Sequence, residues 1–156
     1  MLPHLDAAYN LARWIVGSAQ DAEDAAQEAC LRALNFFDGF HGEDGRAWLL
    51  AIVRNASYDW LRKNRRHELS LVPPEELDRA ADSAPDPETE QLRQADRRLV
   101  QECLERLPAE YREAIVLREM EGMSYKQIAH VTGTPIGTVM SRLARARKRL
   151  AKELQR

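Results

Sequence analysis

The chain has 156 residues, 44% of them hydrophobic and 31% charged, and its formal net charge is −2. It is long enough to form one or two folded domains and too apolar to be disordered throughout. No apolar run approaches the roughly 18 residues of a membrane span, and residues 1–10 lack the pattern of a signal peptide. We therefore expect a cytoplasmic protein without membrane insertion. Cys30 and Cys103 are too few and too far apart to predict a disulfide framework.

The small net charge hides strong local biases. Residues 51–67 carry five basic and one acidic side chain, and residues 135–156 carry seven basic and one acidic. Between these segments, residues 68–92 carry eight acidic and one basic side chain. Two basic segments separated by an acidic one predict a polyanion bound at two places.

Helical periodicity runs through the N-terminal part of the chain. The first helix is expected to end at Gly17, and Asp21 with Asp24 suits the start of a second helix. Residues 38–45 include three glycines and predict a loop, after which a third helix is expected over 46–65. The expected core residues are Leu5, Tyr9, Ala12 and Val16 in the first helix, Ala22, Ala25, Ala29, Ala33 and Phe37 in the second, and Leu49, Ile52, Val53, Ala56 and Trp60 in the third.

The composition changes after the third helix. Residues 68–90 contain four of the seven prolines and no aromatic residue, which is typical of a linker. A helical pattern returns at Leu92. These features predict an all-α chain of two small helical domains, 1–67 and 92–156, joined by a flexible acidic, proline-rich linker over 68–91.

Residues 121–150 have the layout of a helix-turn-helix. Ser124 and Gln127 can form a capping box at the start of its first helix. Gly133 suits a left-handed turn, and Thr134 is expected to cap the second helix just before Pro135. The side of the second helix that should pack on the first comprises Ile136, Val139, Leu143, Ala146 and Leu150.

The opposite face of this second helix carries small and basic side chains. Small residues at its start allow close approach to DNA, and arginine can bond bidentately to guanine. The face therefore predicts binding in the DNA major groove, with a solvated basic face as the alternative. The predicted contact residues are Gly137, Thr138, Met140, Ser141, Ala144, Arg145 and Lys148.

The helix expected over 46–65 has a second basic face. Cations interleaved with an aromatic ring and an amide suit a DNA strand whose bases are partly exposed. Acidic groups in the preceding loop can accept hydrogen bonds from base edges. The predicted contacts are Phe40, His41, Glu43 and Asp44 in the loop and Arg54, Asn55, Tyr58, Asp59, Arg62 and Lys63 on the helix. A solvated basic face is again the alternative.

No catalytic arrangement stands out in the sequence. The four histidines share no metal-ligand spacing, and there is no glycine-rich phosphate loop or nucleophile elbow. The carboxylates of residues 21–28 lie at a helix start, where the helix dipole favours them, and a metal cluster is the alternative interpretation. We expect no enzyme activity, no cofactor and no metal.

Together these segments resemble the sigma-70 family, in its short two-domain extracytoplasmic-function (ECF) group. Residues 21–34, "DAEDAAQEACLRAL", match the family's polymerase-binding helix. Residues 46–66, "RAWLLAIVRNASYDWLRKNRR", are similar to its promoter-melting and −10-recognising helix. Residues 104–150 resemble its −35-binding domain. The resemblance thus makes residues 1–67 a region 2-like domain and residues 92–156 a region 4-like domain.

The resemblance implies a sigma factor that binds core RNA polymerase and directs it to specific promoters for transcription initiation. It implies polymerase contacts at Asp24, Gln27, Glu28 and Arg32, a pocket for a flipped −10 base in the loop, and −35 contacts that include Met140, where family members often have arginine or lysine. Its other implied partners are promoter DNA and an anti-sigma factor, and we expect a monomer when the chain is free. The competing interpretation is a free-standing helix-turn-helix regulator with an N-terminal sensing domain.

Overall fold

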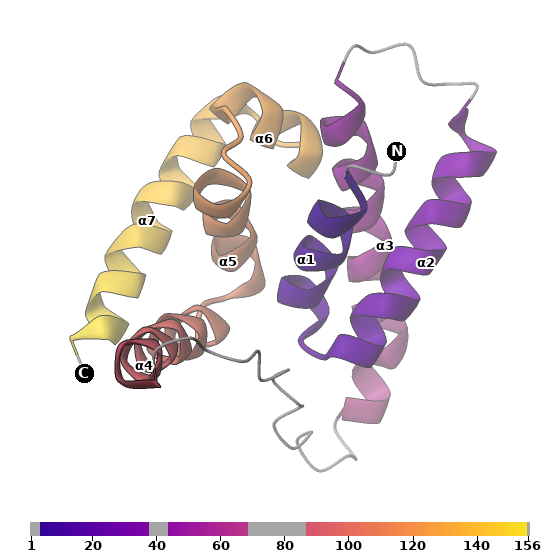
Figure 1. Cartoon of the computed structure of the whole chain (residues 1–156). Coiled ribbons are helices and arrows are strands. Elements are labelled where there is room, and N and C mark those ends of the chain that lie inside the picture. Colours follow the sequence, from indigo (N-terminus) through magenta and orange to yellow (C-terminus); the bar gives the residue numbers. More distant parts are fainter. Residues whose placement is uncertain (1–3, 38–43, 69–86, 156) are drawn as a thin grey trace.

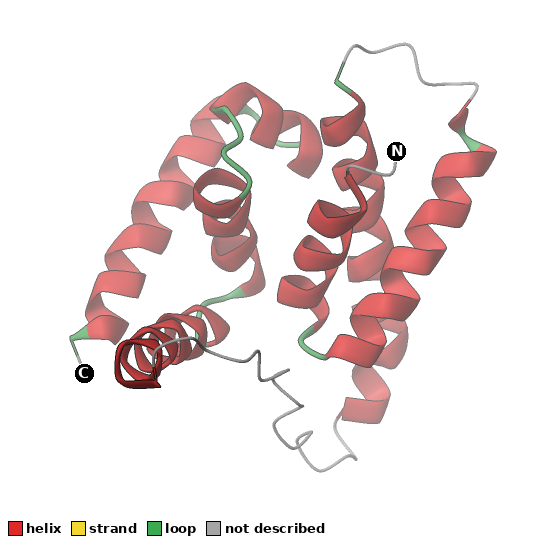
Figure 2. Cartoon of the chain, viewed as in Figure 1, coloured by secondary structure: helices red, strands yellow, loops and turns green. Residues whose placement is uncertain are grey.

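The structure is a computed structural model that describes residues 4–37, 44–68 and 87–155, and every regular element in these ranges is a helix (Figure 2). The all-α prediction is therefore confirmed for the described residues. The N-terminal group consists of α1 (Leu5–Val16), α2 (Ala19–Asn35) and α3 (Gly45–Glu68). The C-terminal group consists of α4 (Pro87–Glu105), α5 (Ala109–Ile115), one π-helical turn (Val116–Met120), α6 (Tyr125–Thr132) and α7 (Ile136–Leu154). No described helix has the length and apolar character needed to cross a membrane.

The boundary between α1 and α2 follows local chemistry. Gly17 ends α1 in the left-handed conformation (φ 93°), as the sequence predicts. The start of α2 differs from the prediction, because Ser18 is its N-cap and the Oγ atom of Ser18 accepts a hydrogen bond from the backbone N–H of Asp21 at 3.2 Å. Asp21 thus lies in the first turn, where the positive end of the helix dipole stabilises its carboxylate.

The core of the N-terminal group is built around small side chains on α2. The predicted alanine stripe of α2 is buried, which lets α1 and α3 pack closely against it. Leu5 and Tyr9 are 39% and 36% exposed, contrary to the prediction, because the buried stripe of α1 is centred on Leu11 and Ile15. Phe37 is also exposed, because α2 ends before it, and its ring makes an edge contact with Trp48.

The helix-turn-helix is formed by α6 and α7. Its capping box is confirmed, with Ser124 Oγ accepting from the N–H of Gln127 (3.1 Å) and Gln127 Oε1 accepting from the N–H of Ser124 (2.8 Å). Gly133 takes the predicted left-handed conformation at φ 67°. The start of α7 differs, because Pro135 occupies the N-cap and the hydroxyl of Thr134 pairs with that of Thr132 at 2.8 Å.

The two groups pack against each other, α6 against α3 and α5 against α1 (Figure 1). Buried residues of both groups belong to one hydrophobic cluster that includes Leu50 and Val53 of α3 and Met123 and Ile128 near and in α6. The described helices therefore form a closed arrangement.

Most of the predicted linker lies outside the described residues, and α4 begins at Pro87, inside the range predicted for that linker.

Candidate nucleic-acid and polymerase interfaces

The rotation of α7 exposes most of the residues predicted to contact the major groove. Val139, Leu143 and Ala146 are buried against the rest of the C-terminal group and fix which side of α7 faces outward. Of the predicted contact residues, Thr138 is partly buried, and the exposed ones are Gly137, Met140, Ser141, Ala144, Arg145 and Lys148. The structure therefore places these side chains on one accessible surface, which we call the α7 face.

The cations of α7 divide into two sets. One set interacts within the C-terminal group: Arg142 with Glu110 (3.7 Å), Arg147 with Glu119 (3.0 Å) and Arg149 over the ring of Tyr111 (5.4 Å). The other set is exposed and makes no ion pair with any described residue; it comprises Arg145, Lys148 and Lys152. Arg145 and Lys148 therefore give the α7 face positive charge that is available for phosphate, and Lys152 extends it along the helix.

Ile136 departs from its predicted place in the core. Its side chain is 44% exposed, and Met140 one turn later is 52% exposed. Ile136 lies in the first turn of α7, at the edge of the stripe defined by Val139 and Leu143. The periodic pattern identifies the residues of the buried stripe, but it does not show whether other helices cover a residue at the edge of that stripe. The exposure of Ile136 could therefore not be derived from the sequence.

The predicted −10 face of α3 is divided by the closed arrangement. Arg54 makes a bidentate ion pair with Glu113 of α5, with Nε–Oε2 and Nη2–Oε1 distances of 2.9 Å. The guanidinium of Arg54 also lies over the ring of Tyr58, 4.7 Å from its centroid. These two side chains thus face the C-terminal group. Asn55, Arg62 and Lys63 remain exposed on α3.

The ion pair between Arg54 and Glu113 is deeply buried at the Glu113 end. The side chain of Glu113 is 1% exposed, and burial raises the pKa of its carboxyl group despite the opposing effect of Arg54. Burial also raises the pKa of the Tyr58 hydroxyl. A buried ion pair adds little net stability, because desolvation offsets the attraction between the charges, but loss of one partner leaves an uncompensated buried charge. Loss of either partner alone should therefore weaken the contact between the groups.

Asp44 is the one predicted loop contact that the structure describes, and it has structural partners. Its Oδ1 accepts from the N–H of Ala47 (3.0 Å) at the start of α3, and its Oδ2 accepts from Nε2 of Gln127 in α6 (2.6 Å). These hydrogen bonds, the one from Ala47 first, lower the pKa of the Asp44 carboxyl group. Phe40, His41 and Glu43 lie outside the described residues.

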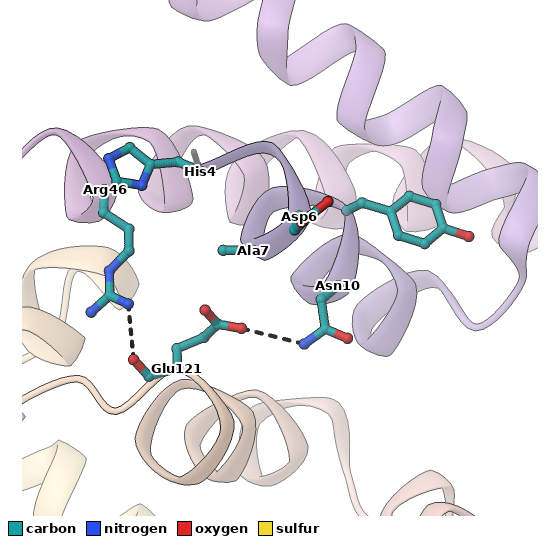
Figure 3. A pocket seen from close by; sticks show the side chains of 7 residues that line it. His4, Asp6, Ala7, Asn10, Arg46 and Glu121 are labelled. Atoms are coloured by element: carbon teal, nitrogen blue, oxygen red, sulfur yellow. Dashed lines mark hydrogen bonds between the residues drawn. The ribbon is translucent and has the colours of Figure 1, made fainter. Parts of the chain in front are cut away.

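A polar hollow of about 760 Å³ lies between the two groups and opens to solvent (Figure 3). Two hydrogen bonds cross it: Arg46 Nη1 donates to the Glu121 carbonyl oxygen at 2.9 Å, and Asn10 Nδ2 donates to Glu121 Oε2 at 3.4 Å. No metal-binding cluster of histidine, cysteine and acidic residues occurs in the part of the chain that the structure describes. The walls of the hollow come mainly from the N-terminal group, and Glu121 supplies the wall from the C-terminal group. Its remaining lining residues are His4, Asp6, Ala7 and Tyr9.

The predicted polymerase contacts lie mainly on the outer face of α2. Asp24, Gln27 and Glu28 are exposed on the side opposite the alanine stripe. Arg32 instead turns toward α3, where it pairs with Asp59 at 2.9 Å and also with Glu28 at 3.3 Å. Asp59 bonds to Arg62 as well. Arg32 therefore links the predicted polymerase-contact helix to the predicted −10 helix.

Two apolar residues on this outer face were not predicted from the sequence. Leu31 is 54% exposed and Leu34 is 67% exposed, and both follow Asp24, Gln27 and Glu28 at helical spacing. Large apolar side chains that are exposed in a row are typical of a protein–protein interface. Their positions opposite the alanine stripe were the signal that could have identified them. We call the set of Asp24, Gln27, Glu28, Leu31 and Leu34 the α2 outer face.

Comparison with known proteins gives two family matches that together cover most of the chain. The model for sigma-70 region 2 matches residues 2–67, and the model for sigma-70, region 4, matches residues 97–150. The chain is 37% identical over 150 residues to the ECF RNA polymerase sigma factor SigE of Mycolicibacterium smegmatis, covering 94% of this chain and 57% of that protein. It is 37% identical over 147 residues to the RNA polymerase sigma-H factor of Pseudomonas aeruginosa, covering 90% of this chain and 76% of that protein.

Two solved structures are also similar. The sigma factor RpoE, in a co-crystal with the anti-sigma factor NepR from Bartonella quintana, has a TM-score of 0.79 at 30% identity, covering 99% of this chain and 93% of that one. CnrH, in complex with the cytosolic domain of CnrY, has a TM-score of 0.67 at 28% identity, covering 99% of this chain and 84% of that one.

Proposed function

This chain belongs to the sigma-70 family, and from that premise we propose that it is an ECF sigma factor that binds core RNA polymerase and directs it to specific promoters. The observation that carries the proposal is the presence of both family segments in one chain whose surfaces are suited to two kinds of partner. The α7 face is basic and exposed, as a DNA contact requires, whereas the α2 outer face is acidic and apolar. DNA binding by itself does not require the second surface.

The proposed division of labour follows these surfaces. Residues 1–67 bind polymerase through the α2 outer face and contact the −10 element through α3, and residues 92–156 contact the −35 element through the α7 face. The family matches to residues 2–67 and 97–150 support this division, with residues 68–91 as the connection. In this role the chain binds and positions other macromolecules and catalyses no reaction of its own.

The closed arrangement adds a conformational requirement. Arg54 and Tyr58 face Glu113, so they become available to −10 DNA only when the two groups separate. The α7 face is accessible without this separation. Binding to core polymerase supplies the free energy for separation if the enzyme holds the two groups apart.

An anti-sigma factor is the further partner we propose. The similar RpoE and CnrH structures were solved in complexes, RpoE with the anti-sigma factor NepR and CnrH with the cytosolic domain of CnrY, and they match this chain over 99% of its length. Such a partner would act in the cytoplasm, where we place the chain as a monomer before it meets polymerase.

Transcription by a reconstituted holoenzyme tests the proposed function. Core polymerase with the chain added should start transcripts from a new set of genomic sites that share two conserved elements at fixed spacing. The 5′ ends of the transcripts, mapped with and without the chain, provide the measurement. A chain that associates with DNA but never changes the start sites used by core polymerase would favour the free-standing regulator.

A further inference from the structure

Two large exposed apolar side chains lie at the start of α7, Met140 on the α7 face and Ile136 at its border with the buried stripe. Ile136 and Met140 are 44% and 52% exposed and lie one helical turn apart, so that their side chains are neighbours. The rest of this face consists of small and basic residues. An exposed apolar pair beside basic residues suits a partner that offers an apolar group beside negative charge.

The surroundings of this pair allow DNA to approach closely. Val139 and Leu143 are buried and fix the rotation of the helix, so Ile136 and Met140 cannot turn inward without displacing them. Gly137 lies between the two, and a Cβ atom placed there would meet no other atom within 4 Å. The backbone at this point is therefore open, and the apolar pair is the bulkiest feature of the first turns of α7.

The charge next to the pair favours DNA as its partner. Arg145 and Lys148 are exposed on the same face, where they can contact phosphates on either side of a groove. Among the base edges in the major groove, the C5-methyl group of thymine is the one apolar feature. Methionine has no hydrogen-bond donor with which to bond guanine as arginine does, but its flexible thioether can adapt to a methyl group.

We propose that Met140, supported by Ile136, is a specificity-determining residue that recognises the C5-methyl group of a thymine in the −35 element. This inference rests on the proposed function. It further specifies that the promoters of this sigma factor carry thymine at the position facing Met140. Arg145 and Lys148 then hold the helix in the groove while the apolar pair selects the base.

Replacing that thymine by deoxyuridine tests the proposal, because deoxyuridine lacks only the methyl group. Holoenzyme should first be used to select −35 sequences from a randomised library, and we expect thymine to be selected at one or two positions. Deoxyuridine at the position facing Met140 should lower affinity about fourfold, the value of one buried methyl group. The variant Met140→Ala should bind the thymine and deoxyuridine promoters equally.

Lys152→Ala is the matched control, since Lys152 is exposed farther along the same helix. It should weaken binding to all promoters alike and reduce the slope of log affinity against log salt concentration by about one unit. The ratio of the affinities for the thymine and deoxyuridine promoters should stay unchanged. Both variants alter exposed side chains, so their melting temperatures should match that of the unaltered chain.

The inference would be overturned if the unaltered holoenzyme bound the thymine and deoxyuridine promoters with equal affinity. It would also be overturned if Met140→Ala left the ratio of these two affinities unchanged. Either result, obtained with a holoenzyme that still selects promoters, would leave the proposed function intact. Failure to form a holoenzyme, or to select any promoter, would instead contradict the proposed function itself.

Discussion

Replacing Arg54 with methionine should separate the N- and C-terminal groups of the free chain. Glu113 is 1% exposed, and Arg54 is its bidentate partner. Breaking a buried pair by removing one partner costs about 3–5 kcal/mol when the other charge stays buried. The chain can relieve this cost by opening, because water then reaches the carboxylate. Small-angle X-ray scattering should show a radius of gyration several ångströms above the roughly 15 Å expected for a compact chain of this length.

The double variant Arg54→Met, Glu113→Met supplies the control for this experiment. Replacing both members of a buried ion pair with apolar residues of similar volume is often neutral or stabilising. The double variant should therefore keep the compact dimensions of the unaltered chain. An Arg54→Met variant that melts at a lower temperature but remains compact would show that Glu113 is buried by its own group, and would contradict the role of the pair in holding the groups together.

The charge reversal Glu28→Lys should lower affinity for core polymerase at least tenfold. Glu28 is exposed near the centre of the α2 outer face, between Asp24 and Leu31, and a lysine there would oppose basic groups on the enzyme. The fold should be almost unaffected, because Arg32 keeps its ion pair with Asp59 and surface substitutions usually change stability by less than about 0.5 kcal/mol. Fluorescence anisotropy of labelled chain titrated with core enzyme measures the affinity.

Asp96→Lys is a control with the same change in charge on the exposed side of α4, away from the α2 outer face. It should leave polymerase affinity within twofold of the original value. Equal losses for Asp96→Lys and Glu28→Lys would show that overall charge governs the interaction. Unchanged binding of Glu28→Lys would remove α2 from the polymerase interface.

The parts of the fold that were predictable from sequence depend on neighbouring residues. The capping box of Ser124 and Gln127 and the left-handed turn at Gly133 are determined within a few positions, and both are confirmed. The start of α2 was placed on the wrong residue, because serine and aspartate both make good N-caps and the sequence offers Ser18 and Asp21 one turn apart.

The contact between the two groups could not be predicted in the same way. Arg54 and Glu113 are 59 residues apart, and each lies on a helix where a charged residue also suits a solvated position. Leu31 and Leu34 differ, because their positions opposite the alanine stripe of α2 already indicated that they are exposed. Local patterns thus predicted the candidate DNA-binding helix well, but they did not predict which cations of α3 are covered.

Binding and opening of one cognate promoter, measured with and without core polymerase, is the most direct test of the proposed function. A fluorescent base analogue in the −10 element reports strand opening, and a labelled promoter end reports binding. Among the described residues, each predicted DNA-contact surface of the free chain offers only a handful of exposed cations, and Arg54 stays in its ion pair. The free chain should therefore bind at micromolar concentration or weaker, with little selectivity and no opening. With core enzyme present, binding should become nanomolar and selective, and the strands should open. Nanomolar, selective binding by the free chain would contradict the sigma-factor assignment and support a free-standing regulator.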